Sequence, residues 1–72
     1  ERVPDHPDLA TSLKDYRQAA GLTQADLAAK VSVSRKTINT IENGVFVPTT
    51  VLALKLARAL TCRVEDLFSL RD

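Results

Sequence analysis

Apolar residues recur every three or four positions along most of this chain, and nowhere do they alternate with polar residues over the length of a β-strand. A spacing of three and four places apolar side chains on one face of an α-helix, whereas a half-buried strand needs a spacing of two. The pattern therefore predicts an all-α fold. We expect five helices, at about residues 9–20, 24–30, 35–43, 50–60 and 64–69.

Short polar residues and glycines stand where these helices should begin and end. Thr23 is expected to cap the second helix, with Asp26 completing a capping box, and Ser34 to cap the third. Gly21 suits the left-handed conformation that often ends a helix. Further boundaries are expected at Asn43-Gly44, at the extended segment before Pro48, and at Thr49 or Thr50.

Length and composition limit the chain to one small domain. It has 72 residues, of which 44% are hydrophobic and 26% charged, enough for a single core. We expect this domain to span residues 8–72, after a loose tail at residues 1–7. The single cysteine, Cys62, excludes an intramolecular disulfide and a multi-cysteine zinc site and favours a reducing, intracellular environment. No apolar stretch approaches the ~20 residues of a membrane span.

The net charge of +1 conceals an uneven distribution. Residues 27–63 contain six basic residues and one acidic residue, whereas both flanking segments are net acidic. A basic stretch of this kind is typical of proteins that meet a polyanion on one face, although it also fits an ordinary solvated surface.

The third predicted helix separates two kinds of residue. Ile38 and Ile41 fall on its inner face, and Glu42 is expected to turn toward the core. The outer face combines long cations with short amide and hydroxyl groups, which can hydrogen-bond both phosphate oxygens and base edges. These residues are Arg35, Lys36, Asn39, Thr40 and Asn43. Composition alone would also suit a plain solvated face.

The segment from Gln24 to Asn43, QADLAAKVSVSRKTINTIEN, resembles the helix-turn-helix of the phage-repressor and Cro-type (Xre-like) family of transcriptional regulators. The likeness extends outward to cover about residues 9–70. It implies a compact five-helix, lambda-repressor-like DNA-binding domain whose recognition helix is residues 35–43. One departure is Ser32, where the family usually has glycine. That position is expected to need a positive φ, at a cost of about 1 kcal/mol.

The resemblance also implies roles for individual residues. Four would read bases or adjoining phosphates in the major groove: Arg35, Lys36, Asn39 and Thr40. Three would bind phosphates: Gln24, Thr37 and Asn43, with the backbone amides of Asn43 and Gly44 facing the same strand. Arg17 and Glu42 would form a largely buried ion pair that supports the scaffold.

The function that follows is sequence-specific binding to a double-stranded DNA operator, as the reader domain of a cytoplasmic, nucleoid-associated transcriptional regulator such as a repressor. The resemblance implies no cofactor. The pattern over residues 47–68 is similar to members with a downstream ligand-sensing domain, which would make this chain an excised reader. The rival interpretation is a helix-turn-helix scaffold used as a protein-interaction module, antitoxin-like or polymerase-binding, without specific DNA readout.

The fourth predicted helix carries a second apolar face. Between Val51 and Leu60 only Lys55 and Arg58 are polar, so the helix is either wholly buried or shared with a partner. We expect a homodimer contact at Val51 and Leu54, together with Val45 or Val47. Two recognition helices would then address half-sites about 34 to 36 Å apart. The alternative is that Phe46 and further parts of the chain cover this face.

Chemistry other than binding finds little support in the sequence. His6 lies in the predicted tail without a second histidine, so no metal site is expected there, and Cys62 is expected to be a structural thiol. The chain has no glycine-rich phosphate loop and no paired carboxylates on a common face. We therefore do not expect an enzyme.

Overall fold

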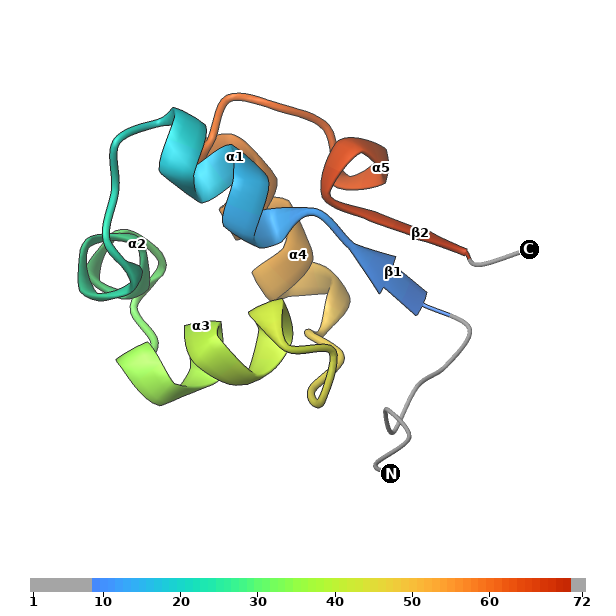
Figure 1. Cartoon of the computed structure of the whole chain (residues 1–72), viewed down its shortest axis with the longest axis horizontal. Coiled ribbons are helices and arrows are strands. Elements are labelled where there is room, and N and C mark those ends of the chain that lie inside the picture. Colours follow the sequence, from blue (N-terminus) through green and yellow to red (C-terminus); the bar gives the residue numbers. More distant parts are fainter. Residues whose placement is uncertain (1–8, 71–72) are drawn as a thin grey trace.

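The computed structural model describes residues 9–70, which form five helices and two short strands (Figure 1). The predicted tail at residues 1–7 lies outside the described residues, as do residues 8, 71 and 72. In chain order the elements are β1 (Leu9–Thr11), α1 (Leu13–Ala19), α2 (Gln24–Val31), α3 (Arg35–Glu42), α4 (Thr50–Ala59), α5 (Val64–Leu67) and β2 (Phe68–Leu70).

The all-α prediction is only approximate, because the two strands pair with each other. β1 and β2 run antiparallel, with Leu9 opposite Leu70 and Thr11 opposite Phe68. The first helix therefore begins at Leu13 and not at residue 9, and the last one ends at Leu67 and not at residue 69. Both ends are extended because each supplies the other with backbone hydrogen-bond partners, and the Ser12 amide continues the contact by donating to the Leu67 carbonyl at 2.7 Å.

Helices α2 and α3 begin at the predicted caps. The Thr23 hydroxyl accepts from the Asp26 amide, and the Asp26 carboxylate accepts from the Thr23 amide, each at 3.0 Å. The bond from the Thr23 amide holds the pKa of Asp26 below its usual value. At α3, the Ser34 hydroxyl accepts from the Thr37 amide at 3.1 Å. Both predicted N-caps are confirmed.

The turn between α2 and α3 depends on Ser32. Its φ of 61° and ψ of 44° lie in the left-handed region, as the sequence predicted. This conformation ends α2 and turns the chain within residues 32–34, so that α2 is seen nearly end-on in Figure 1 while α3 lies along the page. Thr61, after α4, adopts a positive φ of 54° that the sequence did not predict.

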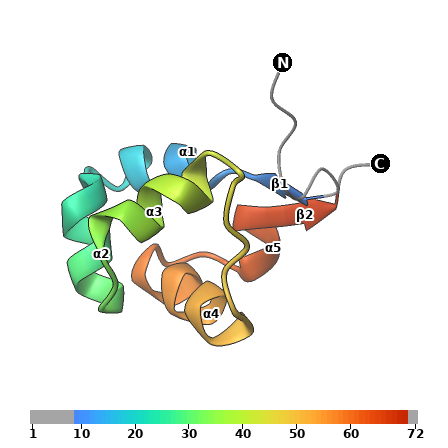
Figure 2. The same cartoon turned by 90° about the horizontal axis from the view of Figure 1, so that it is seen from below.

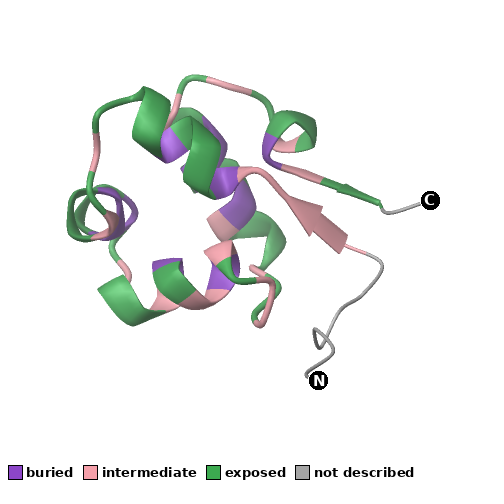
Figure 3. Ribbon diagram, in the orientation of Figure 1, coloured by how far each residue is buried: buried purple, intermediate pink, exposed green. Residues whose placement is uncertain are grey.

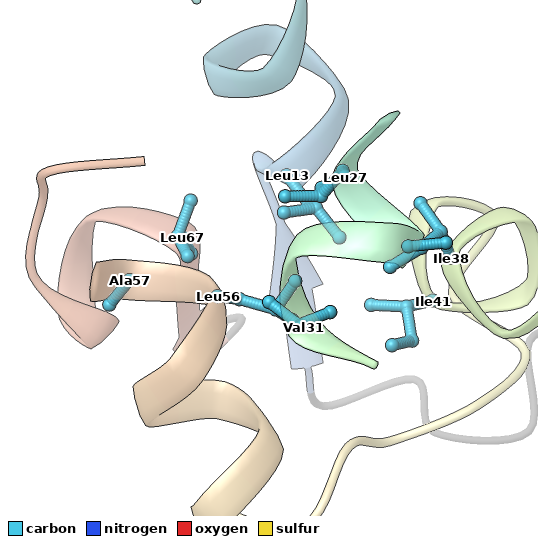
Figure 4. Close-up of a cluster of buried hydrophobic side chains, with 9 residues drawn as sticks. Leu13, Leu27, Val31, Ile38, Ile41, Leu56, Ala57 and Leu67 are labelled. Carbon is cyan, nitrogen blue, oxygen red and sulfur yellow. The ribbon is translucent and has the colours of Figure 1, made fainter. Parts of the chain in front are cut away.

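The core draws side chains from all five helices (Figure 4). Leu27 of α2 and Ile38 and Ile41 of α3 form the seam predicted between these two helices, with the small Ala28 buried beside them and Val33 half-buried. Burying a side chain of this size contributes about 1.5–3 kcal/mol. The largest fully buried side chains are Leu13, Leu27, Ile38, Ile41, Leu56 and Leu67. This core fixes the inner face of α3 and so determines which residues face outward.

Helix α4 is only partly covered. The Thr49 hydroxyl caps it, and Ala53, Leu56 and Ala57 face the core. Val51 and Leu54, on the opposite side, are 63% and 57% exposed. None of the helices in the described part of the chain is long and apolar enough to cross a membrane.

Candidate nucleic-acid interface

The outward side of α3 lies along one edge of the molecule. Figure 3 shows its buried positions on the side facing the other helices, and Figure 2, turned toward this edge, shows α3 unobstructed by any other helix. Arg35, Lys36 and Asn39 are exposed. Thr40 is half-buried, and its hydroxyl donates to the Thr37 carbonyl at 2.9 Å. Three of the four predicted base-reading residues are thus fully presented, and Thr40 only partly.

The charges of α3 oppose the helix dipole. Arg35 and Lys36 occupy the first turn, which contains no acidic residue, and Glu42 occupies the last. The amino end of a helix carries a partial positive charge, so cations there are unfavourable by a few tenths of a kcal/mol to about 1 kcal/mol each. The stability of the helix therefore does not explain why these cations lie in the first turn. Their placement concentrates positive potential at the exposed amino end of α3, which suits contact with an anion.

A buried ion pair holds α3 against α1. The Arg17 Nε donates to Glu42 Oε2 at 2.6 Å, and Nη2 donates to Oε1 at 3.2 Å. A third bond runs from Arg17 Nη1 to the Leu22 carbonyl at 2.8 Å, which ties in the loop before α2. The two side chains are 10% and 3% exposed, so the predicted ion pair is present and largely buried. The bond to Glu42 raises the pKa of Arg17 above its usual value.

Gln24 links α2 to the same carboxylate. Its side-chain nitrogen donates to Glu42 Oε1 at 3.0 Å and to Asn39 Oδ1 at 3.2 Å. Both amide hydrogens are therefore used to brace α3. No hydrogen bond from the backbone amides of Gln24 and Ala25 is seen in the described part of the chain, and both point out of the amino end of α2.

The loop after α3 differs from expectation. We expected the backbone amides of Asn43 and Gly44 to face a DNA strand, but they donate to the carbonyls of Asn39 and Ile41, each at 3.1 Å. These amides are bonded at the end of the helix, because the last carbonyls of a helix need donors. The Asn43 side chain is exposed, and its nitrogen lies 3.4 Å from Asn39 Oδ1.

Thr37 is half-buried beside the cap of its own helix. Its hydroxyl lies 3.0 Å from that of Ser34, and the Ser34 oxygen already accepts from the Thr37 amide. If Ser34 donates its hydroxyl proton to Thr37, the Thr37 proton is free for an acceptor outside the protein.

The structure also brings together cations that the sequence could not group. Lys30 of α2 and Lys55 and Arg58 of α4 line one hollow beside Ser32. The sequence showed that residues 27–63 are basic, but helices distant in sequence supply this cluster. Their convergence therefore required the packing of α2 on α4.

Two residues were set aside in the sequence, Cys62 and His6. Cys62 is half-buried, and burial raises the pKa of its thiol, which disfavours the reactive thiolate. His6 lies outside the described residues. Within residues 9–70 no group of histidine, cysteine and carboxylate side chains has the makings of a metal site.

Comparison with known proteins gives consistent results. The helix-turn-helix family profile matches residues 13–67. An uncharacterised HTH-type transcriptional regulator of Archaeoglobus fulgidus is 42% identical over 64 residues, which are 89% of this chain and 91% of the relative. One from Methanocaldococcus jannaschii is 44% identical over 64 residues, covering 89% and 97%. These relatives are thus little longer than the matched region.

Solved structures share the same arrangement. The restriction-modification controller protein C.AhdI from Aeromonas hydrophila superposes with a TM-score of 0.71 at 33% identity, over 75% of this chain and 82% of its own. The clp gene regulator ClgR from Corynebacterium glutamicum gives a TM-score of 0.71 at 28% identity, over 75% and 57%.

Proposed function

Because the chain belongs to the helix-turn-helix family, we propose that it is the sequence-specific, double-stranded DNA-binding domain of a transcriptional regulator. The observation that carries the proposal is the outward side of α3, where Arg35, Lys36 and Asn39 are exposed while Glu42 is turned inward and paired. A helix of this kind fits the major groove of B-form DNA. The family is not one of enzymes, and we infer no catalytic activity.

The base-reading residues in this proposal are Arg35, Lys36, Asn39 and Thr40. Arg35 or Lys36 donates to O6 and N7 of a guanine, a contact worth about 1–3 kcal/mol of discrimination. The side-chain nitrogen of Asn39 makes no hydrogen bond within residues 9–70 and can donate to a base or phosphate. Since the Thr40 hydroxyl proton is already used, Thr40 contributes its methyl group or its oxygen.

The phosphate-binding residues are Gln24, Thr37 and Asn43. The amides of Gln24 and Ala25 at the amino end of α2 form one anion site, which the helix dipole strengthens. A contact through the Gln24 side chain would require its amide to leave Glu42 or Asn39. Thr37 and Asn43 supply a hydroxyl and an amide from either end of α3, and such contacts set register without reading sequence.

We also propose a homodimer on a symmetric operator, with Val51 and Leu54 in the contact. Phe46, which we considered as a cover for this face, is itself 44% exposed. A repressor of this kind acts in the cytoplasm on nucleoid DNA. A downstream ligand-sensing domain in the parent chain stays a prediction on which the proposal does not depend.

The test is selection of binding sites from randomised duplexes, followed by affinity measurements on the best site. Arg35→Ala and Lys36→Ala should each weaken binding about tenfold or more and relax the preference at one base pair. The matched control is Lys14→Ala, which removes an exposed cation from a different helix, α1. If both α3 variants keep the affinity of the unmodified protein, the assignment of α3 is wrong.

The rival function is a protein-interaction module that does not read DNA, and the exposed apolar residues of α4 are the observation in its favour. Salt distinguishes the two. Binding to DNA through several cations weakens steeply as salt rises, because condensed counterions are released, whereas an apolar protein contact does not. The interaction module would be favoured if the affinity for the selected duplex did not depend on salt. It would also be favoured if no duplex were enriched from the randomised pool.

A further inference from the structure

A series of polar contacts runs from the interior of the molecule to the outward side of α3. It begins at Arg17, whose guanidinium donates to both oxygens of Glu42. Glu42 Oε1 also accepts from Gln24 Nε2 at 3.0 Å, and the same nitrogen donates to Asn39 Oδ1 at 3.2 Å. The Glu42 side chain is 3% exposed, whereas Asn39 is exposed. The contacts therefore connect a buried charge to one of the proposed base-reading residues.

The buried carboxylate determines the direction of each bond in this series. A carboxylate paired with an arginine is ionised and can only accept, so Gln24 must turn its nitrogen, and not its oxygen, toward Glu42. The second hydrogen of that nitrogen then faces Asn39, which must answer with its oxygen. Turning Gln24 over would oppose two acceptors, and turning Asn39 over would oppose two donors. A buried charge thus sets the orientation of an amide on the surface.

Asn39 is left with a donor for DNA and no spare acceptor. Its side-chain oxygen has two lone pairs, and two nitrogens approach it, from Gln24 at 3.2 Å and from Asn43 at 3.4 Å. Its side-chain nitrogen makes no hydrogen bond within residues 9–70. An unconstrained asparagine reads adenine with both groups, accepting from N6 and donating to N7. In this orientation the oxygen of Asn39 is not available to N6.

We propose that Gln24 is a positioning residue that makes Asn39 a reader of keto bases. Asn39 then donates to O6 of guanine or O4 of thymine, which are acceptors in the major groove. Adenine and cytosine carry an amino group at the corresponding place, and two donors facing each other stay unpaired. The inference rests on the proposed function and specifies one base of its target. It leaves the phosphate contact at the start of α2 to backbone amides, since the Gln24 side chain is engaged.

The first measurement needs no DNA. The side-chain amide protons of Gln24 should exchange with water about fivefold or more slowly than those of Gln18, an exposed residue of α1, because both Gln24 protons are bonded. NMR spectroscopy of the labelled, unmodified chain measures both rates. Equal rates would show that the bridge does not exist in solution and would overturn the proposal.

The second measurement is selection from randomised duplexes with variants of Asn39. Asn39→Ala identifies the base pair that this residue reads, because discrimination there should fall about fivefold or more. Asn39→Asp replaces the outward donor with an acceptor, while its other oxygen can still accept from Gln24. Every base pair has one keto and one amino base, so at this pair the two classes should exchange strands. If Asn39 read adenine with both groups, each strand would keep its class.

Gln24→Met tests the bridge without a change of charge, and Glu42 stays paired with Arg17. Once released, Asn39 can turn over, so the ratio of affinities for the keto and amino bases at its pair should shrink to within about threefold. Preferences at other pairs should persist. A purely structural or phosphate-binding role of Gln24 would weaken all duplexes alike. Gln18→Met, the same substitution at an exposed position of α1, is the matched control and should change neither affinity nor preference.

The outcomes distinguish this inference from the proposed function. Enrichment of no duplex by the unmodified chain would reject both. A selected site at which Asn39→Ala changes no base preference would overturn the inference alone, since Asn39 would then contact only the backbone of the DNA. The inference would also fail if Asn39→Asp left the keto and amino bases on their strands, or if Gln24→Met left the preference at that pair unaltered.

Discussion

At the scale of single residues, Glu42 links the fold to the proposed function. Its two oxygens accept from Arg17 of α1 and Gln24 of α2, while Glu42 itself ends α3. One carboxylate thus fixes three helices relative to one another and keeps negative charge away from the outward side of α3. Its side chain is 3% exposed, so loss of either partner would leave a buried charge unpaired.

Glu42→Ala should lower the free energy of unfolding by roughly 3–5 kcal/mol, because it leaves the Arg17 guanidinium buried without a counter-ion. Urea denaturation measures this. The informative control is the double variant Arg17→Met/Glu42→Leu, which replaces the whole pair with apolar side chains and should be less destabilised than Glu42→Ala. A melting temperature for Glu42→Ala within a degree or so of the unmodified protein would contradict the role of the pair.

Backbone strain at Ser32 and Thr61 leads to the prediction that replacing either residue with glycine stabilises the protein. Both residues have positive φ, where a side chain is disfavoured and a β-branched one more so. Ser32→Gly should stabilise the protein by about 1 kcal/mol and Thr61→Gly by at least as much. Gly44→Ala, at a φ of 74° with open space around it, is the reverse substitution and should destabilise. Thermal melts of the three variants provide the comparison, and a loss of stability in Ser32→Gly would show that the turn is not strained.

At the scale of elements, local signals predicted the helix boundaries well. Thr23, Ser34 and Thr49 cap their own helices through bonds to residues three positions ahead, so the information lies within one turn. The strands had no such signal. Each has three residues, too few to show alternation, and each finds its partner at the other end of the chain. Leu9 was assigned to a helix because its spacing of four from Leu13 suits one, and Phe68 because it directly follows Leu67.

Some features of the predicted site follow from the sequence, whereas others depend on how the helices end and pack. Periodicity alone placed Arg35, Lys36 and Asn39 outward, since burial of Ile38 and Ile41 fixes the rotation of α3. The amides of Asn43 and Gly44 were assigned wrongly because periodicity does not reveal how a helix end satisfies its carbonyls. The bridge from Gln24 to Asn39 and Glu42 depends on how α2 crosses α3, which one sequence does not specify.

The inverted charges of α3 predict a conflict between stability and binding. Arg35→Glu replaces a cation with a carboxylate in the first turn and should raise the free energy of unfolding by about 0.3–1 kcal/mol. The same change should abolish operator binding, because it places negative charge against phosphate. Denaturation and a binding titration on one preparation measure both. Lys55→Glu, the same reversal in the middle of α4, should leave stability within about 0.5 kcal/mol. An Arg35→Glu variant that still binds its operator would refute the assigned role.

At the scale of the whole molecule, the strand pair joins the two ends of the described chain. β1 and β2 lie side by side in Figures 1 and 2, next to α5 and apart from α3. Phe68 is half-buried and packs on the core, whereas Leu70 is 75% exposed. The strand pair therefore contributes the Phe68 side chain to the core, next to the buried Leu67.

Phe68→Ala should cost about 1.5–3 kcal/mol of stability, since it removes a packed aromatic ring. Leu70→Ala, two residues further along the same strand, should change stability by less than about 0.5 kcal/mol because its side chain is largely in solvent. Chemical denaturation of both variants tests how much the strand contributes beyond its backbone bonds. Equal losses at the two positions would mean that Leu70 is covered in solution.

The arrangement of α3 has a consequence for how such proteins diversify. Anchoring groups, namely Ile38, Ile41 and Glu42, and outward groups, namely Arg35, Lys36 and Asn39, occupy different sides of the same two turns. Mutations at Arg35 and Lys36 can accumulate without loosening the packing beneath them, whereas Asn39 also accepts a hydrogen bond from Gln24. A transplant of these three side chains and that of Thr40 from another regulator should therefore redirect this scaffold to that regulator's target sequence.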